Sequence, residues 1–274
     1  MIADEDLLRR AAALIRLRSS AGEAPEVGGG TGLRCPTTGA EFVYRDGILD
    51  LLPEDGPKTL SQRSLDTVFT AWLYDRTRES VLKLAGLPDF ETEVGNIASR
   101  LAPQRGDTVV DLACGHGNFT MEWARLVGPD GLVIGLDVSR SMLARAAARV
   151  AESQATNVLL IHGDAHRLPI AAGSVRRVNC SGGFHAFPDL PQALAEIARV
   201  SAPRAVLTAS MFAENPDRPH PRLRELLRAQ LGLHFVPLPW LGEQLRALGY
   251  THYTWSVPKA GFAHVSAVRS IDSR

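Results

Sequence analysis

The chain has 274 residues, of which 45% are hydrophobic and 22% are charged, and this is the composition of an ordinary globular protein. Its 30 basic residues balance its 30 acidic ones, so no net positive field is available to hold nucleic-acid phosphates. No apolar run reaches the length of about 18 residues that a membrane-spanning helix needs. We therefore expect a small-molecule substrate, with no nucleic-acid partner and no membrane span.

The amino end and the cysteines indicate the compartment. Acidic residues at positions 4–6 precede the first apolar stretch, whereas a secretory signal begins with basic residues. Cys35, Cys114 and Cys180 are too widely spaced to build a disulfide framework. We expect a cytoplasmic, reduced protein that works as a monomer or a homodimer.

The first part of the chain, residues 1–58, is predicted to be a small leader. Leucine and alanine recur at helical spacing over residues 2–19, which predicts a helix. A glycine-rich stretch at 28–32 then breaks the helical pattern and is typical of a flexible link. Residues 33–52 alternate apolar and polar side chains around a turn at Asp46-Gly47, which predicts a small β-element.

A helical lid is expected over residues 59–106. The apolar pattern predicts one or two helices over 60–85, which Pro88 ends, and a further helix over 94–101. Aromatic residues of the first of these helices are candidate substrate contacts, against the alternative of ordinary core packing. These residues are Phe69, Trp72 and Tyr74.

From Asp107 onward, short apolar runs alternate with amphipathic stretches, the pattern of βαβ units and a parallel sheet. The predicted strands are 108–112, 132–136, 158–162, 175–180, 204–210, 251–257 and 262–268. The predicted helices are 118–127, 140–153, 190–200, 221–231 and 238–248. We therefore expect an α/β domain over residues 107–274, with a mixed seven-stranded sheet, helices on both faces and a substrate insertion at about 212–248.

The most informative motif follows the first strand of this domain. The buried run 109–112 leads into Gly115 and Gly117, which are spaced by one residue and open a helix. Glycine is needed where the chain turns sharply and where a ligand approaches the backbone. Twenty residues after Gly117, Asp137 ends the next strand, at the spacing from which a carboxylate reaches ribose hydroxyls. Asp164 ends a third strand, where it can face an exocyclic amine.

The motif favours a nucleoside without phosphates. A dinucleotide site usually has a third glycine, which lets the helix approach a pyrophosphate, and Phe119 stands near that position. Asp111 places negative charge beside the turn, where it repels phosphate and attracts an ammonium or sulfonium group. The expected cofactor is S-adenosyl-L-methionine, and a dehydrogenase is the alternative that the missing glycine disfavours.

The stretch from about residue 107 to 212 resembles the class I S-adenosylmethionine-dependent methyltransferases, particularly the branch similar to the quinone-biosynthesis methyltransferases. Four motifs in order carry the resemblance: Asp111–Gly117, Asp137 with Ser139 and Met142-Leu143, Gly163–Pro169, and Phe187–Asp189 with the helix that follows. Ala113 stands where the family usually has glycine. The resemblance implies a Rossmann-like fold and methyl transfer to oxygen or carbon of a small, hydrophobic metabolite of quinone, lipid or secondary-metabolite type.

The resemblance also implies the residues that hold the cofactor. They are Asp111, Ala113, Cys114, Gly115, Gly117, Asp137, Val138, Met142, Gly163, Asp164, Ala165 and Ser181. In this assignment Gly115 and Gly117 flank the methionine part, Asp137 binds ribose, and Asp164 with Ala165 lies at adenine.

His185 is the candidate general base, because it follows the fourth strand, where substrate meets cofactor. An imidazole there could take a proton from a phenol or an enol as the methyl arrives; the alternative is a loop histidine that only packs. Phe184 and Phe212 are further candidate substrate residues. Two other functions stay open: a fold that keeps the cofactor but catalyses another reaction, such as a cyclisation, and a binding module whose pocket has decayed.

The leader resembles the zinc ribbon of some relatives at residues 33–39, which contain Cys35-Pro36, and at residues 47–53. Thr38 stands where those relatives have a second cysteine, and the second cysteine pair is absent from the sequence. One thiolate cannot provide the four ligands of a structural zinc, so we expect a metal-free leader kept for packing or for covering the site.

Overall fold

The computed structural model describes residues 2–16, 24–28, 32–52, 89–214, 234–257 and 262–271. The helices predicted over 60–85 and 221–231 lie outside these residues, as do the candidate substrate residues Phe69, Trp72 and Tyr74. The predicted boundary between leader and lid also lies outside them and stays a prediction.

The described strands form one mixed sheet in the order β1-β2-β3-β4-β7-β6-β5-β8-β9-β11-β10. Their bounds are β1 Glu26–Gly28, β2 Gly32–Arg34, β3 Glu41–Arg45, β4 Ile48–Asp50, β5 Thr108–Leu112, β6 Leu132–Asp137, β7 Val158–His162, β8 Val175–Ser181, β9 Ser201–Phe212, β10 Tyr250–Ser256 and β11 Phe262–Arg269. The α/β class is confirmed, with the predicted strands at β5–β11. The predicted count of seven is wrong, because β4 pairs in parallel with β7 and continues the sheet into the leader.

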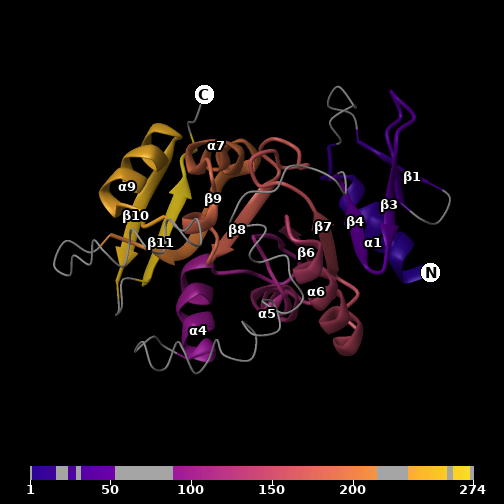
Figure 1. Cartoon of the computed structure of the whole chain (residues 1–274), viewed down its shortest axis with the longest axis horizontal. Helices are drawn as coiled ribbons and strands as arrows, with labels where there is room; N and C mark the ends of the chain where they lie inside the picture. The colour runs from indigo at the N-terminus through magenta and orange to yellow at the C-terminus, as the bar shows by residue number, and fades with distance from the viewer. Residues whose placement is uncertain are drawn as a thin grey trace.

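Helices cover both faces of the sheet, as predicted. Their bounds are α1 Ile2–Ala12, α4 Phe90–Leu101, α5 Asn118–Val127, α6 Arg140–Ser153, α7 Leu190–Val200 and α9 Leu238–Ala247. In Figure 1, α4, α5 and α6 lie below the sheet, and α7 and α9 lie above it. Among the described helices, none has the length and apolarity that crossing a bilayer requires.

Two apolar cores lie on the two faces because successive strand residues point in opposite directions. On β5, Val109 belongs to the core under α4, α5 and α6, whereas Val110 belongs to the core under α1, α7 and α9. On β7, Leu160 and Ile161 divide between the same two cores. Strands β6 and β7 are thus buried on both faces, which is why they are nearly continuous apolar runs in the sequence.

The leader helix α1 covers the sheet at β7, where residues 163–174 connect β7 to β8 without forming a helix. The helix predicted over 2–19 is wrong in its length, because it ends at Ala12. Ile15 instead forms an antiparallel bridge with Ile170, and the Ala171 N–H donates to the Leu14 carbonyl at 2.7 Å. Contacts distant in the sequence therefore override the local helical pattern.

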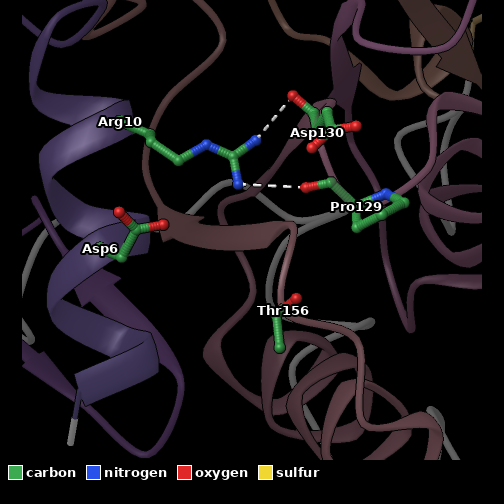
Figure 2. Close-up of a pocket in the computed structure, with 5 residues that line it drawn as sticks. All are labelled: Asp6, Arg10, Pro129, Asp130 and Thr156. Atoms are coloured by element: carbon green, nitrogen blue, oxygen red, sulfur yellow. Dashed lines mark hydrogen bonds between the residues drawn. The ribbon is translucent and has the colours of Figure 1, made fainter.

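Arg10 anchors α1 at the amino ends of β6 and β7. Its guanidinium donates to the carbonyls of Pro129 at 3.3 Å and Asp130 at 3.1 Å (Figure 2). It also donates to the carbonyl of Gly131. The pocket beside it has a volume of about 410 Å³, and Asp6, Arg10, Pro129, Asp130 and Thr156 line it. This pocket lies at the edge of the sheet opposite the glycine motif.

Replacing Leu8 with Ala tests the packing of α1. Leu8 is 1% exposed in the core, so its truncation is expected to lower the free energy of unfolding by about 2–4 kcal/mol, as measured by urea denaturation. Arg9→Ala is the control at an exposed position of the same helix, where its pair with Glu5 lies in water and contributes little. Equal, small losses in both variants would show that α1 does not pack against the sheet.

Candidate cofactor-binding site

The glycine motif forms the turn between β5 and α5. Ala113, Gly115 and Gly117 all have positive φ angles, of 51°, 54° and 81°. Left-handed backbone is strained for residues with a Cβ, which is consistent with the glycine at the position of Ala113 in the family that the sequence resembles. Its methyl group is accommodated because Gly183 faces it, where a Cβ would come within 2.8 Å of the Ala113 Cβ.

The two glycines of the motif face different surroundings. A Cβ on Gly117 would lie 3.0 Å from the Cβ of Ala146, so this glycine lets α5 start close to α6. A Cβ on Gly115 would have no atom within 4 Å, so the backbone there borders open space. Gly117 is therefore a packing glycine, whereas Gly115 leaves room for a ligand beside the turn.

Asp137, at the carboxyl end of β6, ties this turn to the next loop. Its Oδ2 accepts a hydrogen bond of 2.8 Å from the Gly115 N–H, and its Oδ1 accepts one of 2.8 Å from the Ser139 N–H. Burial raises the pKa of Asp137, and these backbone hydrogen bonds oppose the rise. A carboxylate has about four acceptor positions, so two backbone donors leave acceptor capacity for hydroxyl groups of a ligand.

Asp111 lies inside the protein rather than at its surface. Its carboxylate is 1% exposed and accepts hydrogen bonds from Thr120 Oγ1 at 2.6 Å and from Asn179 Nδ2 at 2.7 Å. Burial raises the pKa of Asp111 to about 6, although both hydrogen bonds favour the charged form. Thr208 and Ser181 both donate to Asn179 Oδ1, so the network joins β5 to β8 and β9.

Asp164 pairs with a neighbouring histidine after β7. Its Oδ1 lies 2.6 Å from Nδ1 of His166 and accepts a hydrogen bond of 2.9 Å from the His166 N–H. The hydrogen bond to Asp164 raises the pKa of His166, against the effect of burial. The Asp164 side chain is 40% exposed, so it lies at the rim of the carboxyl edge of the sheet.

His185 lies in the short 3-10 helix after β8, residues 184–186, and is 7% exposed. Burial lowers the pKa of His185 to about 4, so the ring is neutral at pH 7. Its Nδ1 accepts a long hydrogen bond, 3.4 Å, from the Phe212 N–H. With Nδ1 as the acceptor, the ring proton is on Nε2, so the neutral ring can also donate a hydrogen bond.

An aromatic cluster surrounds Phe212 at the carboxyl end of β9. Its ring centroid lies 4.8 Å from that of His185, 5.7 Å from Phe235 and 5.4 Å from Phe262. Phe212 and Phe262 are register partners on β9 and β11. This cluster gives an apolar wall beside His185. Phe262 was not predicted to lie here, because the sequence of the β10–β11 hairpin does not indicate that β11 pairs with β9.

The other predicted cofactor residues lie at or after the carboxyl ends of β5–β8, with Met142 in the first turn of α6. Met142 and Ala165 are buried, whereas Cys114, Val138 and Ser181 are partly exposed. Gly163 follows β7, where a Cβ would lie 3.0 Å from the Leu136 side chain. Among the predicted substrate residues, Phe184 is 1% exposed and contacts Phe187 within the main core, so its ring is a packing residue in this structure.

One cluster of charged side chains at this edge was not predicted from the sequence, because one of its members belongs to the leader. Asp50 on β4 contacts His162 on β7 and Arg140 on α6. The sequence offered no signal for it, since β4 and β7 are separated by more than a hundred residues. The resemblance of residues 33–39 and 47–53 to a zinc ribbon stays a prediction; Cys35 is buried, and its carbonyl accepts a hydrogen bond from the Gly39 N–H.

Asp111→Asn tests the buried carboxylate. The folded pKa of about 6 lies above the ordinary 3.8, so the folded state binds the proton more tightly and wild-type stability rises as pH falls. The free energy of unfolding of the wild type, minus that of the variant, should increase by up to about 3 kcal/mol from pH 7.5 to pH 4, at about 1.4 kcal/mol per pKa unit. Urea denaturation across this range measures it; a pH-independent difference would contradict the prediction.

The comparisons with known proteins agree with this geometry. Residues 109–204 match a family model described as a methyltransferase domain. A demethylmenaquinone methyltransferase of Shouchella clausii is 39% identical over 152 residues, which are 56% of this chain and 62% of that protein. An uncharacterised chloroplastic methyltransferase of Arabidopsis thaliana is 28% identical over 255 residues, 88% of this chain and 71% of that protein. The chain thus covers less than two thirds of the first relative.

A solved structure shows the same fold. A phosphoethanolamine N-methyltransferase of Haemonchus contortus, in complex with S-adenosylhomocysteine, has a TM-score of 0.65 at 16% sequence identity, over 78% of this chain and 62% of that one. The strand order β7-β6-β5-β8-β9-β11-β10, the glycine turn and the family match agree with one another. Residues 109–204 are therefore similar to a methyltransferase domain, and the described chain has the fold of that solved methyltransferase.

Proposed function

We propose that the protein is a methyltransferase that uses S-adenosyl-L-methionine to methylate oxygen or carbon of a small, hydrophobic metabolite. One observation carries the proposal. The Asp137 carboxylate holds the Gly115 N–H beside a stretch of backbone that borders open space, and it keeps acceptor capacity for a ligand.

The residues at the carboxyl edge fit a sulfonium nucleoside. Asp137 can accept hydrogen bonds from the two ribose hydroxyls, and Gly115 leaves the approach to the backbone free of a side chain. Asp111 adds negative charge on the same side when it is ionised, which favours a cationic ligand over a pyrophosphate. Val138, Asp164 and Ala165 would border the adenine, and Gly117 would support the turn from behind.

When bound, the cofactor supplies an activated methyl group with its own leaving group, so the chain mainly has to align the acceptor atom and exclude water. The aromatic cluster around Phe212 provides an apolar wall on the substrate side. His185 touches this wall and is neutral at pH 7. With Nδ1 accepting from the Phe212 N–H, the Nε2–H can donate a hydrogen bond to the substrate oxygen. To take a proton from a phenol or an enol, the ring would have to give up the Phe212 contact so that Nδ1 is free.

The substrate class rests on this wall and on the relatives. Phe212, Phe235 and Phe262 favour a flat, apolar molecule, and the Shouchella clausii relative is named for a demethylmenaquinone. A quinol-type acceptor therefore fits the site better than a nucleic acid or a protein tail. The cytoplasmic location, the absence of a nucleic-acid partner and the monomeric or dimeric state stay predictions.

Replacing Asp137 with Ala tests the cofactor assignment. The variant loses the carboxylate that would bind the ribose and releases the Gly115 and Ser139 N–H groups, so affinity for S-adenosylhomocysteine should fall at least about 100-fold, as measured by calorimetry. Asp130→Ala, an exposed acid at the opposite edge of the sheet, should leave affinity unchanged. Equal affinities in all three proteins would contradict the proposed site.

Product mass separates the proposed reaction from the alternative. With S-adenosyl-L-methionine and a panel of naphthoquinols and catechols, methyl transfer yields products heavier by one CH₂ unit. Formation of isomers without a gain in mass would instead favour a cyclisation on a methyltransferase-like fold.

The pH dependence of turnover tests His185. Because burial lowers the pKa of His185 to about 4, its neutral form already predominates at pH 6, and the acidic limb of kcat/KM should lie near pH 4 rather than near the ordinary 6.5. His185→Ala should lower kcat by about 10²–10⁴-fold if the ring takes the proton. A wild-type inflection near pH 6.5 that disappears in His185→Ala would contradict the lowered pKa.

A further inference from the structure

The leader contributes a charged side chain, Asp50, to the edge of the sheet that carries the proposed site. Asp50 is the last residue of β4, and β4 runs parallel to β7, so this residue lies at the carboxyl edge. The strand register places Asp50 opposite His162, and His162 opposite Asp137 on β6. Asp50, His162 and Asp137 thus lie side by side at the ends of β4, β7 and β6, and Asp137 is the residue proposed to bind the ribose.

Each oxygen of the Asp50 carboxylate has its own partner. Oδ1 lies 2.8 Å from His162 Nδ1, and Oδ2 accepts a hydrogen bond from the Arg140 guanidinium. The side chains are 21% exposed for Asp50, 9% for His162 and 30% for Arg140. Charged hydrogen bonds are stronger in such a partly dehydrated cluster than on an open surface, so we expect the three side chains to hold one another in place.

Both partners of Asp50 act on the segment that follows β6. His162 Nε2 lies 3.2 Å from the Val138 carbonyl oxygen, so the ring bridges the leader carboxylate and the backbone beside Asp137. Arg140 begins α6, immediately after that segment. Burial raises the pKa of the Asp137 carboxyl, and attraction to His162 is among the effects that oppose the rise.

We propose that Asp50 is a positioning residue of the cofactor site: through His162 and Arg140 the leader fixes the conformation of residues 137–140. This inference rests on the proposed function, because residues 137–140 matter only if they hold the nucleoside. In this proposal the leader contributes to cofactor binding through one carboxylate at the end of β4, and the contribution needs no zinc ion in the leader.

Calorimetry with S-adenosylhomocysteine on the full chain tests the inference. Asp50→Ala should raise the Kd about tenfold, since His162 and Arg140 lose the carboxylate that both side chains contact. Asp50→Asn keeps an acceptor oxygen for one partner and should give a smaller increase. Glu41→Ala removes an exposed carboxylate from β3 of the same leader and should leave the Kd at the wild-type value.

A double-mutant cycle separates positioning from simple stabilisation of the fold. Asp50→Ala and Arg140→Ala should each raise the Kd, and the double variant should raise it by less than the product of the two, because both remove the same contact. A role in stability alone would lower the unfolding midpoint of Asp50→Ala, with the Kd of the folded protein unchanged, and would overturn the inference.

The two proposals fail in different ways. If the wild type and Glu41→Ala bind the nucleoside and Asp50→Ala binds it equally well, the role of Asp50 is wrong and the proposed function stands. If the wild type itself does not bind S-adenosylhomocysteine, the proposed function falls and the inference falls with it.

Discussion

The site depends on the burial of negative charge at the carboxyl edge of the sheet. Asp111 and Asp137 are almost fully enclosed, and an enclosed carboxylate is tolerated only where hydrogen-bond donors surround it. For Asp137 the donors are backbone N–H groups of the two loops it joins, so meeting its requirement also sets the shape of both loops. For Asp111 the donors are side chains of α5 and β8. The hydrogen-bond donors that these two carboxylates require thus determine the local structure at the carboxyl edge.

The leader is part of this arrangement rather than an attachment to it. Strand β4 adds to the edge at β7, and α1 covers the face that the β7–β8 connection leaves without a helix. In Figure 1 the leader elements stand beside β7 at one end of the sheet, whereas β10 and β11 close the other end. The two ends of the described chain therefore extend the same sheet in opposite directions, with the cofactor edge between them.

The sequence predicted the central domain well because its signals are local. Strands β6 and β7 are nearly continuous apolar runs buried on both faces, and α5, α6 and α7 begin and end where the predicted periodicity does. The glycine turn and Asp137 follow from spacing alone. These features can be predicted without knowing which segments distant in the sequence contact each other.

The remainder depends on contacts between segments far apart in the chain. The parallel pairing of β4 with β7 joins residues 48–50 to 160–162, and short leader strands carry no mark of their partner. The end of α1 at Ala12 is set by pairing with residues near 170. Asp50 and Phe262 reach the site only through such pairings, so neither could be identified as a site residue from its neighbours in the sequence.

The docking of α1 and β4 on β7 has a consequence for biosynthesis. Both elements leave the ribosome long before residues 158–162 are made, so their apolar side chains, such as Leu8 and Ile48, have no native surface to meet during that interval. The leader cannot form its native contacts until β7 has been synthesised, and contacts between segments so far apart in the sequence slow folding. Nascent chains halted before residue 158 should therefore depend on chaperones more than those released after it.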